Sequence, residues 1–338
     1  MVISSIIMSA WLIKPLIGFV IDNSLNKRFW IIVASLLSVT TVLLLGLNQL
    51  PVFLLVAFLL LHSTYAAFRD VSVDGIMCVE GKKAQATGKI QSVQWISINV
   101  SAILVGIGGG YIAEKSGYKL GFLLLLPIYL VIILVALRYK EEKAIRPKNY
   151  LSVDLKKLFR DKNLLVVALF IFLYKFSPSF GTPLFFLQRD SFKWGKVWIG
   201  GLSTIGTVFG IVGSLCYYKM SSKINLKKWL YWSVFLGAAT TLSYLYYTPV
   251  TAVIYDIIYS FIGMFIFLMI MNFMARNTLS GLEATSFAFL CSVSNLALVA
   301  SNLSGAFFLP KLGLQWLIII SSLASFLCLP LIRHLKDK

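Results

Sequence analysis

Long apolar stretches, separated by short polar connections, recur along the whole chain. Each is close to the roughly 20 residues that an α-helix needs to cross a hydrocarbon core about 30 Å thick. A membrane β-barrel would instead show alternating segments of about ten residues. The pattern therefore predicts an all-α, polytopic membrane protein. We expect eleven transmembrane helices, at 3–21, 30–48, 52–75, 90–113, 118–137, 163–187, 197–218, 229–247, 250–274, 284–309 and 313–333.

One connection is far more polar than the others and divides the apolar runs into five before it and six after it. Two related halves with a site between them are the plan of many secondary transporters. We expect an N-terminal transmembrane half at 1–137, a cytoplasmic linker at 138–162 and a C-terminal transmembrane half at 163–338. Against a plan of six plus six, twelve helices are expected and the first is missing. Either the sequence starts downstream of it or the protein lacks it.

The composition agrees with a membrane location, with 59% hydrophobic and 13% charged residues. The net charge of +18 would also suit a nucleic-acid partner. However, the basic residues cluster in alternate loops, as the positive-inside rule expects. The charge therefore indicates a lipid bilayer as the partner and not nucleic acid. It places the C-terminus in the cytoplasm and the N-terminus outside, and we expect a bacterial cell (inner) membrane.

No motif for catalysis or for a bound cofactor occurs in the sequence. The four cysteines lie far apart without a CxxC pair, which predicts neither a metal site nor a disulfide framework. The glycine run at 105–110 lacks the lysine of a phosphate-binding loop and is expected to be a helix-packing face. We find no G-x-S-x-G and no Ser/His/Asp arrangement. The sequence predicts neither an enzyme nor a cofactor.

The segment GFVIDNSLNKR at 18–28 resembles the loop signature of the major facilitator superfamily. Gly18 would permit a close helix approach. Asp22, near the membrane face, would pair with cations or a helix N-terminus in one conformation and release them in another. Lys27 and Arg28 supply the basic pair. The matching loop at 213–228 has no acid, so we expect only one charge latch.

Four segments narrow the resemblance to the folate/biopterin transporter family within that superfamily: WLIKPLIGFVID at 11–22, RDVSVDGIMCVEGKKAQATGKIQSVQW at 69–95, KFSPSFGTPLFFLQRDSFKWGKVWIGGLSTIG at 175–206 and SGLEATSFAFLCSVSNLA at 280–297. They occur in the family's order, and the resemblance as a whole covers nearly all of the chain. The last segment adds Glu283 to the expected cytoplasmic gate. The resemblance implies a carrier of pterins, folates or, in some members, S-adenosylmethionine, generally coupled to protons. The acid usual in the family's second-half loop is absent here.

Charged residues gather near the end of the third apolar run. This run begins near Pro51 outside, and at 1.5 Å per residue Arg69 lies about 27 Å further, near the cytoplasmic mouth. Asp70 and Asp74 share a helix face and would raise one another's proton affinity. Arg69 is expected to pair with one of them, with Glu80 or with Asp22. The cluster is interpreted as a gate with proton-coupling acids, or alternatively as a static anchor of interfacial charges.

Ionisable residues deeper in the bilayer are costly, and a functional role is their default interpretation. His62 is a candidate proton carrier, or else a histidine bonded to a neighbouring helix. Lys175 lies shortly before Pro178, which would interrupt the helix. Its ammonium suits an anionic substrate. Alternatively, it pairs with Asp256 or snorkels to the membrane interface. Asp256 would accept hydrogens from a pterin ring that stacks on tyrosines. The remaining candidates for substrate contact, chosen for depth and neighbours, are Tyr65, Tyr174, Tyr259, Asn99 and Asn295. For the two asparagines, a hydrogen bond between helices is the alternative.

The sequence thus predicts a secondary transporter for proton-coupled uptake of folate, pterin or a related anion. A carrier of another substrate, such as a muropeptide, a drug or S-adenosylmethionine, remains an alternative. So does a truncated relative that does not transport. A basic cavity around Lys175 argues against cationic drugs.

Overall fold

The computed structural model describes residues 9–11, 13–24, 26–141 and 158–335. Helices make up 86% of the structure, and no strand occurs in these residues, which confirms the all-α prediction. Most of the predicted linker 138–162 lies outside the described residues. So does the beginning of the predicted span 3–21.

The chain forms two compact units that do not follow the order of the sequence. Unit 1 consists of Met1–Ala84, Leu104–Arg160 and Thr278–Ser292. Unit 2 consists of Gln85–Ile103, Asp161–Asn277 and Val293–Lys338. A helix of the first half is thus part of unit 2, and the beginning of a late helix is part of unit 1.

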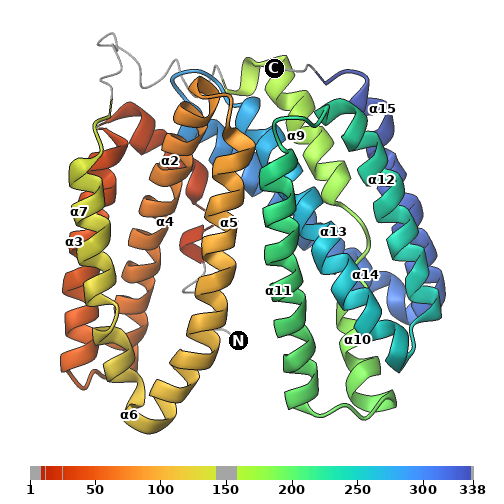
Figure 1. The fold of residues 1–338 in the computed structure, drawn as a ribbon, viewed down its shortest axis with the longest axis horizontal. Coiled ribbons are helices and arrows are strands. Elements are labelled where there is room, and N and C mark those ends of the chain that lie inside the picture. Colours follow the sequence, from red (N-terminus) through yellow and green to blue (C-terminus); the bar gives the residue numbers. More distant parts are fainter. Residues whose placement is uncertain (1–8, 12, 25, 142–157, 336–338) are drawn as a thin grey trace. The chain divides into compact units, whose positions relative to one another are not determined.

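In unit 1, α3 packs against α4, α6 and α7, and α2 packs against α4 (Figure 1). The π-helical turn η2 leads into α6, and the first residues of α14, up to Ser292, complete the unit. Its elements are η1 (Ser9–Trp11), α2 (Lys14–Asn23), α3 (Lys27–Leu47), α4 (Val52–Lys83), η2 (Val105–Gly109), α6 (Gly110–Leu123), α7 (Leu126–Arg138) and the start of α14 (Glu283–Ala324).

In unit 2, α13 packs against both α11 and α12, while α9 packs against the turn η5. Figure 1 shows α11, α12 and α13 as neighbouring helices of this unit. Its elements are α5 (Thr87–Leu104), α9 (Lys162–Lys175), α10 (Gly181–Phe186), η3 (Leu187–Ser191), α11 (Lys196–Met220), α12 (Leu226–Ser243), η4 (Tyr244–Tyr246), α13 (Pro249–Arg276), the rest of α14, η5 (Ser325–Cys328) and α15 (Leu329–Ile332).

Each predicted apolar run contains a helix, but several helices are interrupted. Gly117 and Gly313 have left-handed backbone angles, with φ of 76° and 75°, and separate the adjacent predicted runs in the two halves. The run 163–187 is broken between α9 and α10, around Pro178. Six helical stretches of the described chain are long and apolar enough to cross a membrane: Lys27–Leu47, Val52–Lys83, Glu114–Arg138, Trp198–Met220, Pro249–Arg276 and Glu283–Ile332.

Side-chain caps define the starts of several helices. Thr248 and Thr251 form a reciprocal capping box in front of α13, with Pro249 at the first helical position. Asp161 accepts a hydrogen bond from the Leu164 amide at 2.8 Å at the start of α9. Asn225 does the same for the Lys228 amide at the start of α12. These caps satisfy amides that have no partner inside the helix.

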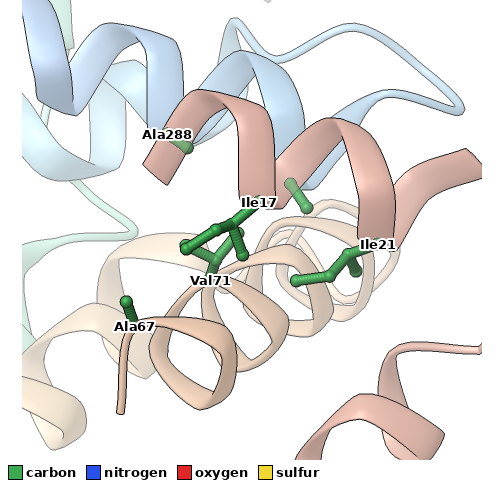
Figure 2. Close-up of a cluster of buried hydrophobic side chains, with 6 residues drawn as sticks. Ile17, Ile21, Ala67, Val71 and Ala288 are labelled. Carbon is green, nitrogen blue, oxygen red and sulfur yellow. The ribbon is translucent and has the colours of Figure 1, made fainter. Parts of the chain in front are cut away.

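A small apolar core joins α2, α4 and the first turns of α14 in unit 1. Figure 2 shows Ile17 and Ile21 of α2 facing Ala67 and Val71 of α4, with Ala288 of α14 beside them. All are buried, with at most 3% of their surface exposed. The small residues Ala67, Ala284 and Ala288 let the helices approach closely. This core positions the start of α14 beside the loop at 18–28.

Candidate functional site

Two adjoining pockets lie in unit 2. The first has a volume of about 390 Å³ and includes residues of α5, α11 and α13. The second has a volume of about 320 Å³ and includes residues of α9, α12 and α13. Tyr259, Gly263 and Phe267 line both, so the pockets share a wall on α13. Both are within the size range of small-molecule sites, roughly 300–1,000 Å³.

Five residues that the sequence predicts for substrate contact line these pockets. Asn99 and Asp256 line the first pocket, Tyr174 and Lys175 line the second, and Tyr259 lines both. The other two lie elsewhere in the fold. Asn295 is exposed on α14 and lines neither pocket, and Tyr65 is half-buried in unit 1.

Lys175 is the last residue of α9 and faces the second pocket. Its ammonium lies 5.2 Å from the centroid of the Phe267 ring, a cation–π contact. Within the described part of the chain it has neither an acidic partner nor a hydrogen-bond acceptor, so the expected alternative of a pair with Asp256 is not formed. A poorly compensated ammonium in a pocket favours the arrival of an anion.

The chain directly after Lys175 leaves the helix and is held by serines. The Ser177 amide donates to Ser301 Oγ at 3.0 Å, and the Ser179 amide donates to the Ser301 carbonyl at 2.9 Å. The Ser177 hydroxyl donates to the Ser321 carbonyl, and the Ser321 hydroxyl donates to the Pro178 carbonyl. Non-helical backbone inside a membrane protein needs such partners because lipid supplies none. The break at Pro178 therefore ends α9 with Lys175 at the pocket.

Tyrosines surround Asp256 on and near α13. Tyr255 stacks on Tyr259 with ring centroids 5.2 Å apart, and Tyr244 lies 5.4 Å from Tyr259. The Tyr259 hydroxyl bonds to Ser243, and the Tyr174 hydroxyl donates to Ser233 Oγ at 2.9 Å. Aromatic faces next to a carboxylate suit a flat heterocycle with hydrogen-bond donors on its edge.

Asn99 adds an unused donor to the first pocket. Its Nδ2 is buried and has no hydrogen-bond partner in the described structure. A buried amide without a partner costs free energy, which a ligand that accepts this hydrogen bond would recover. Asn99 on α5 and Asp256 on α13 thus contribute a donor and an acceptor to the same pocket.

Asp22, Lys27 and Thr285 form a polar cluster at the loop signature of unit 1, which we call the latch. Asp22 Oδ2 accepts hydrogen bonds of 2.7 Å from both the amide and the hydroxyl of Thr285, in the first turn of α14. Lys27 Nζ lies 3.6 Å from Asp22 Oδ1 and 3.9 Å from Glu141 Oε1. The carboxylate therefore binds a helix N-terminus and a cation together, which is the geometry expected for Asp22.

The latch is buried, and the helices packed around it approach closely at Gly18. A Cβ on Gly18 would lie 2.8 Å from the Thr285 Cα, so only glycine permits this approach of α2 to α14. Asp22 lies just beyond the predicted span 3–21 and is 1% exposed. Burial raises the pKa of the Asp22 carboxyl, although Lys27 and the two Thr285 donors act in the opposite direction.

Three other predicted gate residues, Arg28, Glu283 and Glu80, form hydrogen bonds outside the latch. The Arg28 amide donates to Glu141 Oε2 at 2.9 Å, and Glu283 accepts from the Gly281 amide at 3.0 Å. Glu80 accepts from the Tyr139 hydroxyl at 3.0 Å. Thr285 and Glu141 were not predicted. Thr285 lies in the G-x-E-x-T segment, whose helix start could have identified it, whereas Glu141 follows the fifth run without a motif.

Arg69 has other partners than the acids we expected. Its guanidinium donates to Ser38 Oγ at 2.5 Å and to the Ala34 carbonyl at 3.0 Å, both on α3, and it lies over the Tyr129 ring. The prediction of a pair with Asp70, Asp74, Glu80 or Asp22 is wrong for this structure, because a hydroxyl and a free lone pair on a helical carbonyl satisfy the side chain. Asp70 instead binds Lys14 at 2.5 Å, and Asp74 is buried.

His62 is bonded to a neighbouring helix. Its Nε2 lies 2.9 Å from the Tyr129 hydroxyl on α7, and its Nδ1 is buried with no partner in the described structure. Tyr129 also lies under Arg69, so the three side chains form one polar group inside unit 1.

Comparison with known proteins identifies the family. The model of the BT1 family matches residues 1–338. A folate-biopterin transporter of Synechocystis sp. is 24% identical over 95% of this chain and 71% of its own length. A probable folate-biopterin transporter 4 of Arabidopsis thaliana is 28% identical over 34% of this chain and 25% of its own length.

Solved structures show the same fold. The fucose:proton symporter FucP of E. coli has a TM-score of 0.77 at 14% identity, with 100% of this chain and 92% of that chain covered. The human organic anion transporter TETRAN has a TM-score of 0.72 at 16% identity, with 98% and 82% covered. At such identities the likeness concerns the fold alone. Together with the family match, it shows that this chain belongs to the BT1 (folate/biopterin transporter) family and is a multi-pass membrane transporter with the helical fold of the major facilitator superfamily.

Proposed function

We propose that this protein carries a folate, a pterin or a related anion across the membrane by alternating access, coupled to protons. The observation that carries the proposal is the pair of adjoining pockets in unit 2. One contains a carboxylate and the other contains an ammonium without an acidic partner in the described residues. A ligand with a hydrogen-bond-donating ring and an anionic tail complements both. The names of the relatives support the same substrate class.

The first pocket suits the pterin ring. Asp256 would accept hydrogens from the ring's amine and amide edge, and Asn99 Nδ2 would donate to a ring carbonyl or nitrogen. Tyr259 would stack on the ring face, which is worth about 0.5–1.5 kcal/mol for an aromatic pair beyond its buried area.

The second pocket suits the anionic part. Lys175 would bind a carboxylate through a charge-assisted hydrogen bond, with Tyr174 beside it. The contact of the ammonium with Phe267 keeps the cation directed along the pocket wall before a ligand arrives. Tyr65 and Asn295 remain candidates for substrate contact in a conformation other than this one.

Proton coupling and gating are proposed for the polar residues of unit 1. His62, Asp70 and Asp74 would take up and release the proton. The gate would consist of the residues that the sequence predicts for it, which are Gly18, Asp22, Lys27, Arg28, Arg69, Glu80 and Glu283. In this scheme Asp22 releases the start of α14 once per transport cycle, because its bonds to Thr285 hold that helix in only one conformation.

We further propose that the two halves at 1–137 and 163–338, joined by the linker 138–162, rock about the pockets. The membrane would be the bacterial inner membrane, with the C-terminus in the cytoplasm. The placement of basic residues in alternate loops supports this orientation.

Uptake of labelled folate by cells expressing the chain tests the proposal. We expect uptake above that of empty cells, competition by free pterin and collapse when a protonophore is added. Uptake that persists with the protonophore would remove the proton from the proposal. If the protein inserts into the membrane but takes up no folate, the substrate is another one, such as a muropeptide, a drug or S-adenosylmethionine, or the protein does not transport.

A further inference from the structure

A third cavity, an apolar groove, lies among α11, α12 and α13 of unit 2. Its volume is about 230 Å³, and its lining residues are apolar apart from Ser233. It shares Ser233, Ile262 and Ile266 with the second pocket, but it contains neither Lys175 nor Asp256. Its side chains include Met220, Trp229, Trp232, Leu236, Phe261 and Phe265.

The rim of the groove is exposed and apolar. Trp232 is 61% exposed, Leu236 41% and Trp229 37%. α12 is an apolar helix of a multi-pass membrane protein, so we expect these exposed side chains to contact lipid, and tryptophans are enriched where the hydrocarbon core meets the headgroups. A pterin or folate would leave its polar edge without partners in this groove, which is unfavourable. The groove therefore suits a hydrocarbon chain and not the transported molecule.

Three exposed lysines lie at one end of the groove. α11 ends at Met220 and α12 begins at Leu226, so Lys219, Lys223 and Lys228 surround the turn next to Met220 and Trp229. The stretch 213–228 contains no acidic residue. None of the three lysines forms an ion pair with any residue that the structure describes.

The neighbouring Lys227 has a different role. It donates to the carbonyl oxygens of Arg333 at 3.2 Å and Leu335 at 3.3 Å, and is thus used within the protein. The three remaining ammonium groups are free to meet a ligand. Basic groups at the ends of membrane helices, next to an opening between those helices, match the headgroup of an anionic lipid.

We propose that this groove is a binding site for one anionic glycerophospholipid. An acyl chain lies along Trp232, Leu236 and Phe261, and the phosphate is bound by Lys219, Lys223 and Lys228. A volume of 230 Å³ corresponds to about eight water molecules at about 30 Å³ each, which is room for part of a single acyl chain. Burial of that chain contributes through the hydrophobic effect, and the lysines select the headgroup.

Native mass spectrometry of the purified full chain tests this site. The protein is incubated with phosphatidylglycerol or with phosphatidylcholine of the same chain length, and bound lipids are counted. We expect phosphatidylglycerol to bind at least about tenfold more tightly, because each lysine near an anionic headgroup adds to the attraction. Replacement of the three lysines (K219Q/K223Q/K228Q) should remove this preference and leave phosphatidylcholine binding unchanged.

Two further variants distinguish the contribution of the lipid's acyl chain from that of its headgroup. Leu236→Trp fills the groove and should weaken the binding of both lipids. A control with three exposed lysines replaced elsewhere (K115Q/K193Q/K311Q) should bind phosphatidylglycerol like the unmodified protein. Equal binding of the two lipids by the unmodified protein would overturn the proposal. So would an equal loss in the control, which would mean general attraction to positive charge, or unchanged binding by Leu236→Trp.

Discussion

At the scale of single residues, two lysines of this protein make the same contact in different surroundings. Lys175 and Lys311 each hold their ammonium over a phenylalanine ring, at 5.2 Å and 3.5 Å from the ring centroid. Lys311 is exposed on α14, whereas Lys175 faces a pocket next to tyrosines. The cation–π contact is therefore common to both, and only the pocket distinguishes a candidate binding residue.

This difference makes Lys311 a matched control for Lys175. Lys175→Ala should raise the KM for folate uptake by roughly 10–100-fold, since a charge-assisted hydrogen bond contributes about 1.5–3 kcal/mol. Competition by free pterin, which lacks the carboxylate tail, should change much less. Lys311→Ala should leave both unchanged. Equal effects of the two variants in the uptake assay would show that the charge acts on folding and not on the substrate.

Asp22 leads to a prediction about pH. Its pKa is raised by burial in the latched structure, and an opened latch would give the carboxyl its ordinary value. The latched form therefore binds more protons than the open form, and by linkage it is stabilised as pH falls toward the raised pKa and destabilised as pH rises above it. Hydrogen exchange at the Thr285 amide, which donates to Asp22, reports the latch directly.

In that measurement, protection of the Thr285 amide, corrected for intrinsic exchange, should increase as the pH falls. Asn at position 22 resembles the protonated acid, so Asp22→Asn should remove the pH dependence. The Leu164 amide, bonded to the capping side chain of Asp161, serves as the control. Protection that falls on acidification would contradict the assigned direction.

How far the sequence anticipates these sites depends on what determines them. Depth in an apolar run, counted from its ends, led to five residues that line the pockets, Asn99, Tyr174, Lys175, Asp256 and Tyr259, because a polar residue inside the bilayer is costly unless it faces a cavity or a partner. The same criterion also led to Tyr65 and Asn295, which line neither pocket. The partner of Arg69 was mispredicted, because a charged side chain can bind a hydroxyl and a carbonyl on the next helix as well as an acid. No pattern in a single sequence shows which helix is next.

At the scale of helices, both units contain close approaches at which glycine leaves room for the neighbouring helix. In unit 1, Gly18 of α2 lies against Thr285 of α14. In unit 2, a Cβ on Gly88 of α5 would lie 2.7 Å from the Ser221 Cβ. Both glycines lie in segments that carry the family resemblance, Gly18 at 11–22 and Gly88 at 69–95, but only the contact at Gly18 was predicted.

The contact at Gly18 can be tested with a second helical glycine. Gly18→Ala places a methyl group 2.8 Å from the Thr285 Cα and 2.9 Å from the Ala284 carbonyl oxygen. We expect a loss of about 1–3 kcal/mol from overpacking, seen as a lower midpoint of thermal unfolding in detergent. Gly121→Ala on α6 adds a methyl group to open space and should have no such effect. A neutral Gly18→Ala would mean that α2 and α14 are not tightly packed.

Unit 2 uses neutral hydrogen bonds where unit 1 uses charge. The Thr87 hydroxyl donates to Asn272 Oδ1 at 2.5 Å, and Asn272 Nδ2 donates to the Tyr217 hydroxyl at 2.9 Å. All three residues are buried. These neutral hydrogen bonds connect α5 to α11 and α13, although the loop at 213–228 has no acidic residue.

Asn272→Leu should therefore be costly. It leaves the Thr87 and Tyr217 hydroxyls buried without this partner, which we expect to lower the free energy of unfolding by about 1–3 kcal/mol for each group. Asn302→Leu, at an exposed position of α14, should be close to neutral. Equal unfolding midpoints for both variants would show that the three residues do not form a stabilising network.

At the scale of the whole molecule, the pattern of apolar runs was enough to predict an all-helical membrane fold, and the loop signature was enough to indicate the superfamily. The assignment of α5 to unit 2 and of the first turns of α14 to unit 1 was not predictable in this way. Apolar runs identify the helices but not their neighbours, which depend on small residues and polar contacts such as Asp22 with Thr285. The folate/biopterin family match extends over the entire chain, so the fold and the transporter class rest on independent grounds.

We propose that the whole chain moves a folate-like anion together with protons through the pockets of unit 2. The most direct test is uptake of labelled folate by proteoliposomes that contain only the purified chain, with an imposed proton gradient. We predict that folate accumulates above its equilibrium level, that a protonophore abolishes the accumulation, and that Lys175→Ala but not Lys311→Ala removes it at low folate concentration. If correctly inserted protein accumulates no folate, or accumulates it equally without a proton gradient, the proposed proton-coupled transport of folate is contradicted.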